Sequence, residues 1–345
     1  MADTLHLPPG DPTAIFEFYR GAVATELLVA ATHHLEVFAR VRAPMTWGDL
    51  RAALGLEERA ATVLMTALRA MGLMARGGDG RIGPTALARD FLDPASGFSV
   101  AGYLGMQADS PGVVELARKL RADKPIGAHG DVSQFIFKEG AGSSMEQEAS
   151  ARALTLALAG RARAVAPILA ERLELGSART LIDVGGGTGL YAIACLQRYP
   201  GLRAVVWDRP EVLKVAAEHA ARYGVADRLT CRSGDMFVDP VPTGDVVLLS
   251  NILHDWDVAE CRRIVARCAG ALPVGGRLVI HDVLLDDDLG GPLPIALYSA
   301  QLFAVTEGRA YSAAEYSGWL REAGLTARAP VPTLVHCAAI VGEKP

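Results

Sequence analysis

The stretch Leu181-Ile182-Asp183-Val184-Gly185-Gly186-Gly187-Thr188-Gly189 decides the fold that this sequence predicts. Its first half is a short apolar strand. Its second half is a glycine-rich turn, which lets a ligand approach the backbone because glycine has no Cβ. A second apolar strand, Val246 to Leu249, runs into Ser250-Asn251 and then, three residues later, into His254. Because α/β proteins bind ligands at the carboxyl ends of parallel strands, we expect the turn and the histidine at one sheet edge, as in an enzyme.

The residues around these two stretches alternate between expected strands and helices. Strands are expected at 181–184, 203–207, 228–231, 245–250 and 277–284, and helices at 188–198, 210–223, 258–271 and 313–323. This alternation predicts an α/β domain with a mostly parallel sheet and helices on both faces. The tail from Leu325 to Val341 holds two extended runs around Pro330 and Pro332. A tight connection joins only antiparallel strands, so the last strand is expected to be antiparallel.

Residues 1–100 predict a separate, mainly helical domain. An amphipathic run from Ala14 to Ala31 precedes helices at 47–53 and 59–71, and residues 72–82 predict two short strands around a glycine turn. This is the order of a winged helix. Residues 1–95 hold nine arginines, no lysine and eleven acidic residues, a net charge of −2. DNA binding needs a basic surface, so the domain is expected to dimerise with a second copy of the chain instead.

A helical connecting region at 101–178, which also holds helices of the substrate site, is expected between this domain and a catalytic domain at 179–345. Residues 98–125 predict helix, residues 125–142 a glycine-containing connector, and residues 145–173 a long alanine-rich helix.

Composition narrows the class of protein further. Half of the 345 residues are hydrophobic, 21% are charged, and the net charge is −5, so no attraction to nucleic acid or to an anionic membrane is expected. The N-terminus lacks a signal-peptide pattern, and no run approaches the roughly 20 apolar residues that span a bilayer. The five cysteines show no C-x-x-C pair. We therefore expect a reduced, cytoplasmic protein.

Two aspartates narrow the choice of ligand for the glycine turn. Gly187-x-Gly189-x-x-Ala192, with Asp208 located 21 residues after Gly187, loosely fits a dinucleotide fingerprint. Asp183, however, would repel a pyrophosphate and attract the ammonium group of an amino-acid-like ligand. Asp208 ends the second strand, where it can accept both hydroxyls of a ribose, although it can also cap the helix that begins at Pro210. A ligand with a ribose, an amino acid and no phosphate is S-adenosylmethionine.

Three motifs in order resemble one enzyme family. Asp-Val-Gly-Gly-Gly-Thr-Gly at 183–189, Gly234-Asp235-Met236-Phe237, and Asn251-Ile252-Leu253-His254-Asp255-Trp256 are similar to motifs of the small-molecule O-methyltransferases of the caffeate and hydroxyindole type. That family includes bacterial enzymes that tailor aromatic antibiotics. The resemblance covers nearly the whole chain. It implies a Rossmann-like class I methyltransferase domain behind an N-terminal winged-helix dimerisation domain, and hence a homodimer.

The resemblance also implies which residues hold the cofactor. Gly185 would bind the cofactor, Asp208 would bind its ribose, Asp235 would hold the adenine amino group, and Met236 would pack on the ring. Plant members place a lysine four residues before the histidine, where this chain has Ser250. The full set of cofactor-binding candidates is Asp183, Gly185, Gly187, Asp208, Asp235, Met236 and Ser250.

His254 is the candidate general base. A phenol titrates near pH ~10 and is a poor nucleophile at neutral pH, whereas a histidine with a pKa of about 6.5 can take its proton during methyl transfer. Without the motif, His254 would be a polar residue ahead of a helix. Plant members flank this histidine with two glutamates. The first falls at Asp282, which would orient the imidazole, and the second falls at Ala310, unless Glu307 replaces it.

The acceptor is expected to be a small aromatic molecule, bound by residues that match acceptor positions in the family: Asn251, Tyr298, Gln301, Phe303 and Val305. His281, beside Asp282, is a possible metal ligand. The chain after residue 290 offers no further histidine until His336, so no bound metal is expected. The function predicted from the sequence is O-methylation of an aromatic hydroxyl in specialised metabolism. The alternatives are C-methylation of an α-keto acid or ring carbon, a winged-helix regulator that senses S-adenosylmethionine, and a catalytically silent binding protein.

Overall fold

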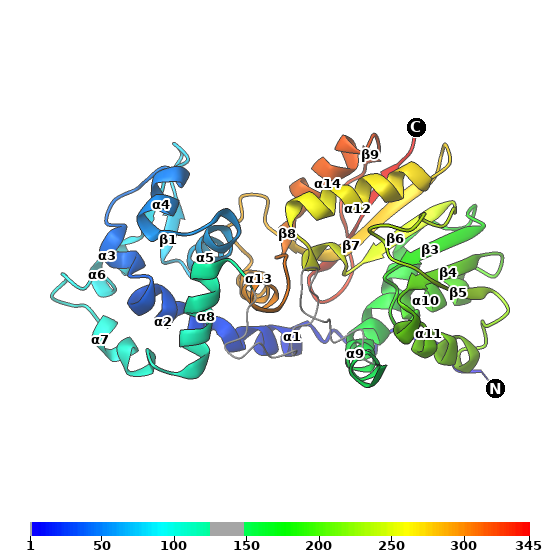
Figure 1. Cartoon of the computed structure of the whole chain (residues 1–345), viewed down its shortest axis with the longest axis horizontal. Helices are drawn as coiled ribbons and strands as arrows, with labels where there is room; N and C mark the ends of the chain where they lie inside the picture. The colour runs from blue at the N-terminus through cyan, green and yellow to red at the C-terminus, as the bar shows by residue number, and fades with distance from the viewer. Residues whose placement is uncertain (1, 125–147) are drawn as a thin grey trace. The chain divides into compact units, whose positions relative to one another are not determined.

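A computed structural model describes residues 2–124 and 148–345, so the predicted connector at 125–142 lies outside the described residues (Figure 1). By packing, the chain divides into two units. The catalytic unit is Met1–Phe16, Phe135–Leu284 and Tyr311–Pro345, and the helical unit is Glu17–Gln134 and Leu285–Ala310. The sequence-based boundaries near 100 and 178 therefore differ from the division by packing, in which residues 285–310 group with the N-terminal helices.

The catalytic unit is built on one large sheet. Its spatial order is β10-β11-β7-β6-β3-β4-β5; β8 pairs with β7, and β9 pairs with β11. The five strands from β7 to β5 are parallel, and β11 is antiparallel to β7, which confirms the predicted topology. The strands are β3 (Thr180–Val184), β4 (Arg203–Asp208), β5 (Leu229–Ser233), β6 (Val246–Ser250), β7 (Arg277–Leu285), β8 (Tyr311–Ser312), β9 (Thr326–Ala327), β10 (Val331–Pro332) and β11 (Cys337–Glu343).

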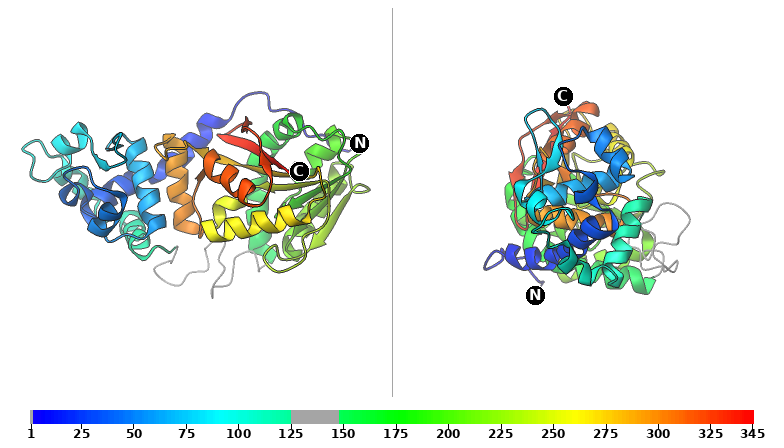
Figure 2. Two further views of the ribbon diagram at one scale, coloured as in Figure 1. Left: turned by 90° about the horizontal axis from the view of Figure 1, so that it is seen from above. Right: turned by 90° about the vertical axis from the view of Figure 1, so that its left-hand side faces the viewer.

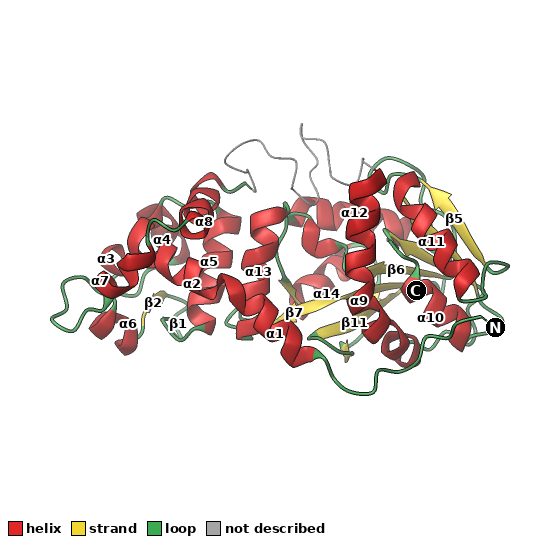
Figure 3. Cartoon of the chain, turned by 90° about the horizontal axis from the view of Figure 1, so that it is seen from below, coloured by secondary structure: helices red, strands yellow, loops and turns green. Residues whose placement is uncertain are grey.

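Helices cover both faces of this sheet (Figures 1 and 3). One face carries α9 (Glu148–Arg172), α10 (Leu190–Arg198) and α11 (Pro210–Arg222), and the other carries α12 (Val258–Ala271) and α14 (Ala313–Glu322). Within α9, the segment Arg152–Arg172 is long and apolar enough to span a membrane, but 44% of its most apolar window is buried in the fold. Packing against α10 and α11 accounts for the apolar character of α9.

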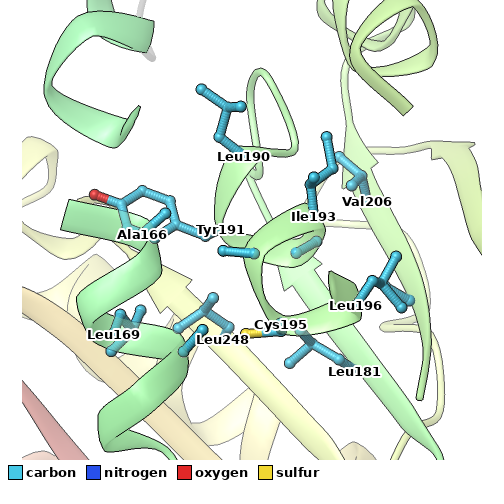
Figure 4. Close-up of a cluster of buried hydrophobic side chains, with 14 of the residues drawn as sticks. Ala166, Leu169, Leu181, Leu190, Tyr191, Ile193, Cys195, Leu196, Val206 and Leu248 are labelled. Carbon is cyan, nitrogen blue, oxygen red and sulfur yellow. The ribbon is translucent and has the colours of Figure 1, made fainter. Parts of the chain in front are cut away.

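The period-2 geometry of the strands explains the two cores. Leu181 and Leu248 point into the α9–α10–α11 layer, whereas their neighbours Ile182 and Val247 point into the α12–α14 layer. Figure 4 shows the first layer, in which Leu181 and Leu248 meet side chains of α9 and α10 such as Leu169. Burial on both faces is why these strands read as continuous apolar runs.

The helical unit matches the predicted winged-helix order. Its elements are the end of α1 (Thr13–Arg20), a 3₁₀ turn at Gly21–Val23, α2 (Ala24–Val29), a π-helical turn at Ala30–His34, α3 (Val37–Arg40), α4 (Trp47–Leu54), α5 (Glu58–Ala70), β1 (Met74–Arg76), β2 (Ile82–Pro84), α6 (Ala86–Phe91), α7 (Ala101–Leu104), a 3₁₀ turn at Gly105–Gln107, α8 (Pro111–Ala122) and α13 (Leu293–Val305). β1 and β2 form the expected antiparallel hairpin. α13 lies beside α5, although the two are far apart in sequence (Figure 2, left).

Two local features differ from the sequence-based expectation. The helix predicted at 98–125 is replaced, within the described residues up to 124, by two helices, α7 and α8, because Ser110 is extended and Pro111 begins a new helix. The run from Ala14 to Ala31 is likewise interrupted by the 3₁₀ turn between α1 and α2.

Candidate active site

The structure brings His254 and Asp282 together. A short 3₁₀ turn after β6, Leu253–Asp255, carries His254, and the neighbouring parallel strand β7 carries Asp282. His254 Nδ1 lies 2.5 Å from Asp282 Oδ1, and both side chains are buried. The sequence predicted these two residues as a base and its orienting carboxylate.

Charge fixes the proton positions in this pair. Burial opposes the charged form of His254, but the carboxylates of Asp282 and Asp255 outweigh it and raise the pKa of the imidazole. Burial likewise opposes the charged form of Asp282, but His254 and three hydrogen bonds lower the pKa of this carboxyl. An ionised carboxylate only accepts hydrogen bonds, so Nδ1 carries a proton, and in the neutral imidazole Nε2 is the nitrogen that can accept one.

Asp282 is itself held from two directions. Its Oδ1 accepts the backbone N–H of Val283 at 2.8 Å, and its Oδ2 accepts the hydroxyl of Tyr316, on α14, at 3.0 Å. Nearby, the hydroxyl of Tyr311 donates to the carbonyl of Trp256 at 2.6 Å. Sequence reasoning missed Tyr316, since nothing in a local pattern shows that a tyrosine 34 residues away reaches Asp282.

A second carboxylate lies on the outer side of the imidazole. Asp255 Oδ1 is 3.6 Å from His254 Nε2, and burial raises the pKa of the Asp255 carboxyl to about 6. Asp255 therefore adds negative potential at the nitrogen that is positioned to take a proton.

The glycine turn between β3 and α10 has the backbone that its sequence predicts. Gly185 and Gly187 have φ values of 63° and 58°, in the left-handed region that favours glycine. A Cβ on Gly185 would lie 2.5 Å from Ile252 Cδ1, whereas a Cβ on Gly187 would meet no chain atom within 4 Å. The turn thus packs against the His254 segment at Gly185 and is open at Gly187.

Asp208 anchors this turn. Its Oδ2 accepts the backbone N–H of Gly187 at 2.9 Å, and its Oδ1 accepts that of Arg209 at 2.7 Å. Burial raises the pKa of the Asp208 carboxyl, and the two amides oppose this shift. Arg209, not Asp208, is the N-cap of α11. A carboxylate has about four acceptor positions, so Asp208 can still take the hydroxyls of a ribose.

Asp183, at the carboxyl end of β3, is the clearest sign that a cationic group belongs here. It is fully buried, and neither carboxylate oxygen has a donor in hydrogen-bond geometry among the described residues. Burial raises the pKa of the Asp183 carboxyl to about 7, the Ala192 amide opposes the shift, and Asp208 adds to it. A buried carboxylate with no donor in full hydrogen-bond geometry is stabilised by a nearby positive charge. The residues present therefore fit a cofactor that carries cationic groups and a ribose.

Asp235 and Met236 lie after β5. Asp235 is exposed, and its Oδ1 accepts the backbone N–H of Phe237 at 2.8 Å. Met236 is half-buried and packs against the α12–α14 core. Each can therefore still present part of its side chain to a ligand.

Ser250, Asn251 and His281 form a hydrogen-bonded group. His281 Nδ1 lies 2.9 Å from Ser250 Oγ, and Asn251 Nδ2 donates to Ser250 Oγ at 3.1 Å. Within 2–124 and 148–345, no group of three or more His, Cys, Asp or Glu side chains is arranged to hold a metal.

The predicted acceptor residues after 290 all lie on α13, in the helical unit. The guanidinium of Arg20 lies 4.5 Å from the ring centroid of Tyr298, and that of Arg59 lies 4.3 Å from the ring centroid of Phe303. Gln301 Nε2 donates to the carbonyl of Arg20 at 3.3 Å, and Val305 is 38% exposed. The structure thus places these four residues on a different unit from His254 and Asn251.

The two positions considered for a second orienting carboxylate also belong to the helical unit. Ala310 is fully buried, and its backbone N–H donates to Ser299 Oγ at 3.1 Å. Glu307 is half-buried.

Comparison with known proteins agrees with this geometry. The model of the O-methyltransferase domain family matches residues 128–326. A 3-hydroxy-5-methyl-1-naphthoate 3-O-methyltransferase from Streptomyces sahachiroi is 36% identical over 91% of this chain and 89% of its own. An O-methyltransferase family 2 protein from Planctomyces limnophilus DSM 3776, solved in complex with apigenin, has a TM-score of 0.91 and 46% identity over 100% of both chains.

A third relative connects the family with the cofactor. Human N-acetylserotonin methyltransferase in complex with S-adenosylmethionine has a TM-score of 0.58 and 25% identity over 96% of both chains. The glycine turn, the His254–Asp282 pair and the family match agree, and the chain belongs to the O-methyltransferase family as an S-adenosylmethionine-dependent enzyme.

Proposed function

We propose that this enzyme transfers a methyl group from S-adenosylmethionine to a hydroxyl on an aromatic ring, with His254 as the general base. The observation that carries the proposal is the buried His254–Asp282 contact of 2.5 Å, which orients the imidazole through Nδ1 and makes Nε2 the nitrogen that would accept a proton. The relatives support the acceptor class, because a hydroxynaphthoate and apigenin are both aromatic molecules with ring hydroxyls. Tailoring of such a molecule in specialised metabolism is the corresponding role.

In this proposal the chain's own residues bind, orient and move one proton. S-adenosylmethionine, when bound, supplies an electrophilic methyl group. Asp183, Gly185, Gly187, Asp208, Asp235, Met236 and Ser250 would hold it. His254 Nε2 would take the proton of the acceptor hydroxyl, and Asp282 would stabilise the resulting imidazolium through Nδ1. Much of the acceleration would come from holding the reacting atoms in line.

The acceptor would be bound by Asn251 and by the α13 residues Tyr298, Gln301, Phe303 and Val305. We further propose that the enzyme is a cytoplasmic homodimer that binds neither nucleic acid nor membrane. Exposed apolar side chains on α1 support the dimer: Ile15, Phe18 and Tyr19 are 70%, 84% and 73% exposed. Of two other apolar side chains in this region, Leu28 is half-buried, and Phe16 packs within the catalytic unit.

Replacement of the base tests the proposal. His254→Ala should bind S-adenosylmethionine in calorimetry within a few-fold of wild type, but lose about 10²–10⁴-fold in kcat, the range for a general base. His6→Ala, which changes an exposed histidine outside the site, is the matched control and should leave both unchanged. Turnover by His254→Ala within a few-fold of wild type would remove the role of His254 as base.

A further inference from the structure

A row of buried and half-buried polar side chains runs from Thr333, which follows β10, to Tyr191 on α10 beside the base. The proposed chemistry gives no role to its members Thr333, His281 and Tyr191. Thr333 Oγ1 lies 3.0 Å from His281 Nε2, and His281 Nδ1 lies 2.9 Å from Ser250 Oγ. Asn251 Nδ2 donates to Ser250 Oγ at 3.1 Å and to the hydroxyl of Tyr191 at 3.3 Å. The imidazole of His281 is the middle member of this row.

The directions of the two hydrogen bonds of His281 follow from the first member of the row. The Thr333 hydroxyl donates to the carbonyl of Cys337 at 3.1 Å. A hydroxyl has one hydrogen, so Thr333 Oγ1 must accept from His281, which places the imidazole proton on Nε2. Nδ1 then accepts the hydroxyl of Ser250, and the Ser250 oxygen is left to accept from the Asn251 amide. The Cys337 carbonyl thus sets the orientation of the Asn251 side chain.

The environment of His281 keeps this imidazole neutral. The side chain is fully buried, and burial lowers its pKa to about 3; Asp282 opposes this shift and Arg161 adds to it. The two groups that bind its ring nitrogens are hydroxyls, which do not stabilise a cation as a carboxylate does. The ring of Tyr191, labelled in Figure 4, packs edge-on against it with centroids 5.4 Å apart.

Asn251, a member of the row, lies just ahead of the base. It has φ 57°, a left-handed conformation that asparagine adopts more readily than other residues with a side chain. Its backbone N–H donates to the His281 carbonyl at 2.8 Å. His281 therefore holds the start of the segment 250–254 through backbone and side chain, while its neighbour Asp282 holds the end of the segment through His254.

We propose that His281 is a positioning residue: a neutral Nε2–H imidazole that transmits hydrogen-bond direction from Thr333 to Ser250 and Asn251 and so fixes the turn that presents His254. The expected effect on kcat rests on the proposed function of His254 as the general base. The assignment of the His281 proton to Nε2 does not rest on that function, and a separate experiment tests it.

Nitrogen NMR tests the proton order directly. In protein labelled with ¹⁵N-histidine, long-range ¹H–¹⁵N spectra distinguish the two neutral tautomers from imidazolium. The chain has eight histidines, and the His281 signals are assigned by their loss in His281→Phe. We expect the Nε2–H tautomer with no titration between pH 5 and pH 9. An Nδ1–H tautomer, or a ring that titrates in this range, would overturn the proposal.

Thr333→Val links the tautomer to activity. Valine has nearly the shape of threonine but cannot accept a hydrogen bond, so His281 should move its proton to Nδ1 and donate to Ser250. We expect kcat to fall about tenfold or more, as misplacement of a reacting group does, with affinity for S-adenosylmethionine within twofold of wild type. Thr333→Ser keeps the hydroxyl and should retain both the wild-type tautomer and wild-type kcat.

Each outcome bears on a different claim. A tautomer switch in Thr333→Val with unchanged kcat would show that the row does not position the base. If His254→Ala proved fully active, the proposed base would be wrong, while the tautomer of His281 would still decide the proton order.

Discussion

Asp282 sets the chemistry of the site at the scale of single residues. The carboxylate accepts three hydrogen bonds, from His254, Val283 and Tyr316, and these keep its pKa low despite burial. In turn, its charge raises the pKa of His254. A base with a raised pKa holds a transferred proton more strongly, but it also becomes protonated, and so unable to accept a proton, at a higher pH.

The first prediction follows from the sign of that shift. In wild type, kcat should fall as the pH falls through the pKa of His254, because the imidazolium cannot act as a base. Asp282→Asn removes the charge that raises this pKa, so the acid limb of the pH profile should move to lower pH while kcat falls about 10²–10⁴-fold. Tyr316→Phe, which keeps the carboxylate, should change both much less. An unmoved acid limb in Asp282→Asn would contradict the assignment.

The second prediction concerns the cofactor. Asp208→Ala should weaken S-adenosylmethionine binding at least tenfold in calorimetry, since loss of a charged acceptor costs about 1.5–3 kcal/mol. Asp208 also binds the Gly187 amide. Asp208→Asn, which keeps one acceptor oxygen, should therefore lose less. Wild-type affinity in Asp208→Ala would leave Asp208 with only a role in anchoring the turn.

Sequence and structure contribute different parts of the site. Local motifs singled out His254 and Asp282, because a histidine after one strand and a carboxylate on the next meet at a parallel sheet edge. They could not show Tyr316 or Thr333, which reach Asp282 and His281 across 34 and 52 residues of sequence. The sequence suggested His281 as a possible metal ligand, and only the structure shows that hydroxyl groups lie within hydrogen-bond distance of both of its ring nitrogens.

At the scale of elements, helices with strong end signals were the most predictable. α12 begins after Asp257, whose side chain accepts the backbone N–H of Glu260, and α14 begins after Ser312, which forms a capping box with Glu315. α13 was not predicted. Its sequence is apolar on nearly every side, so it lacks the 3.6-residue period that marks a surface helix.

The third prediction uses the cap of α14, the helix that carries Tyr316. Ser312→Ala should lower the free energy of unfolding in urea by about 0.5–2 kcal/mol and should also lower kcat, because Tyr316 holds Asp282. Thr46→Ala is the matched control, since Thr46 caps α4 by accepting the backbone N–H of Asp49. Thr46→Ala should lower the free energy of unfolding by a similar amount and leave kcat unchanged. Equal kcat values in the two variants would show that α14 does not support catalysis by holding Asp282 through Tyr316.

At the scale of the whole molecule, the notable feature is a set of large apolar side chains that a single copy of the chain leaves exposed to solvent. Besides Ile15, Phe18 and Tyr19 on α1, the helical unit exposes Phe98, Tyr103 and Met106 at 76–77% each. Clustered exposed apolar residues are typical of protein interfaces.

The fourth prediction is therefore about mass. Light scattering at micromolar concentration should give twice the 36.4 kDa of the chain. Phe18→Glu should shift this value toward the monomer, because a charge would be buried in an apolar interface. Glu17→Lys, a change on the same helix in an already charged side chain, is the control. A monomeric wild type with full activity would exclude an obligate dimer.

Product analysis tests the central claim most directly. The wild-type enzyme is incubated with S-adenosylmethionine carrying a ¹³C-labelled methyl group and, in separate reactions, a hydroxynaphthoate, apigenin and an α-keto acid. The account predicts one labelled methyl on an aromatic ring oxygen, identified by mass spectrometry and carbon NMR, and at least about a hundredfold less product with His254→Ala. Label attached to carbon, or methylation of the α-keto acid alone, would contradict it.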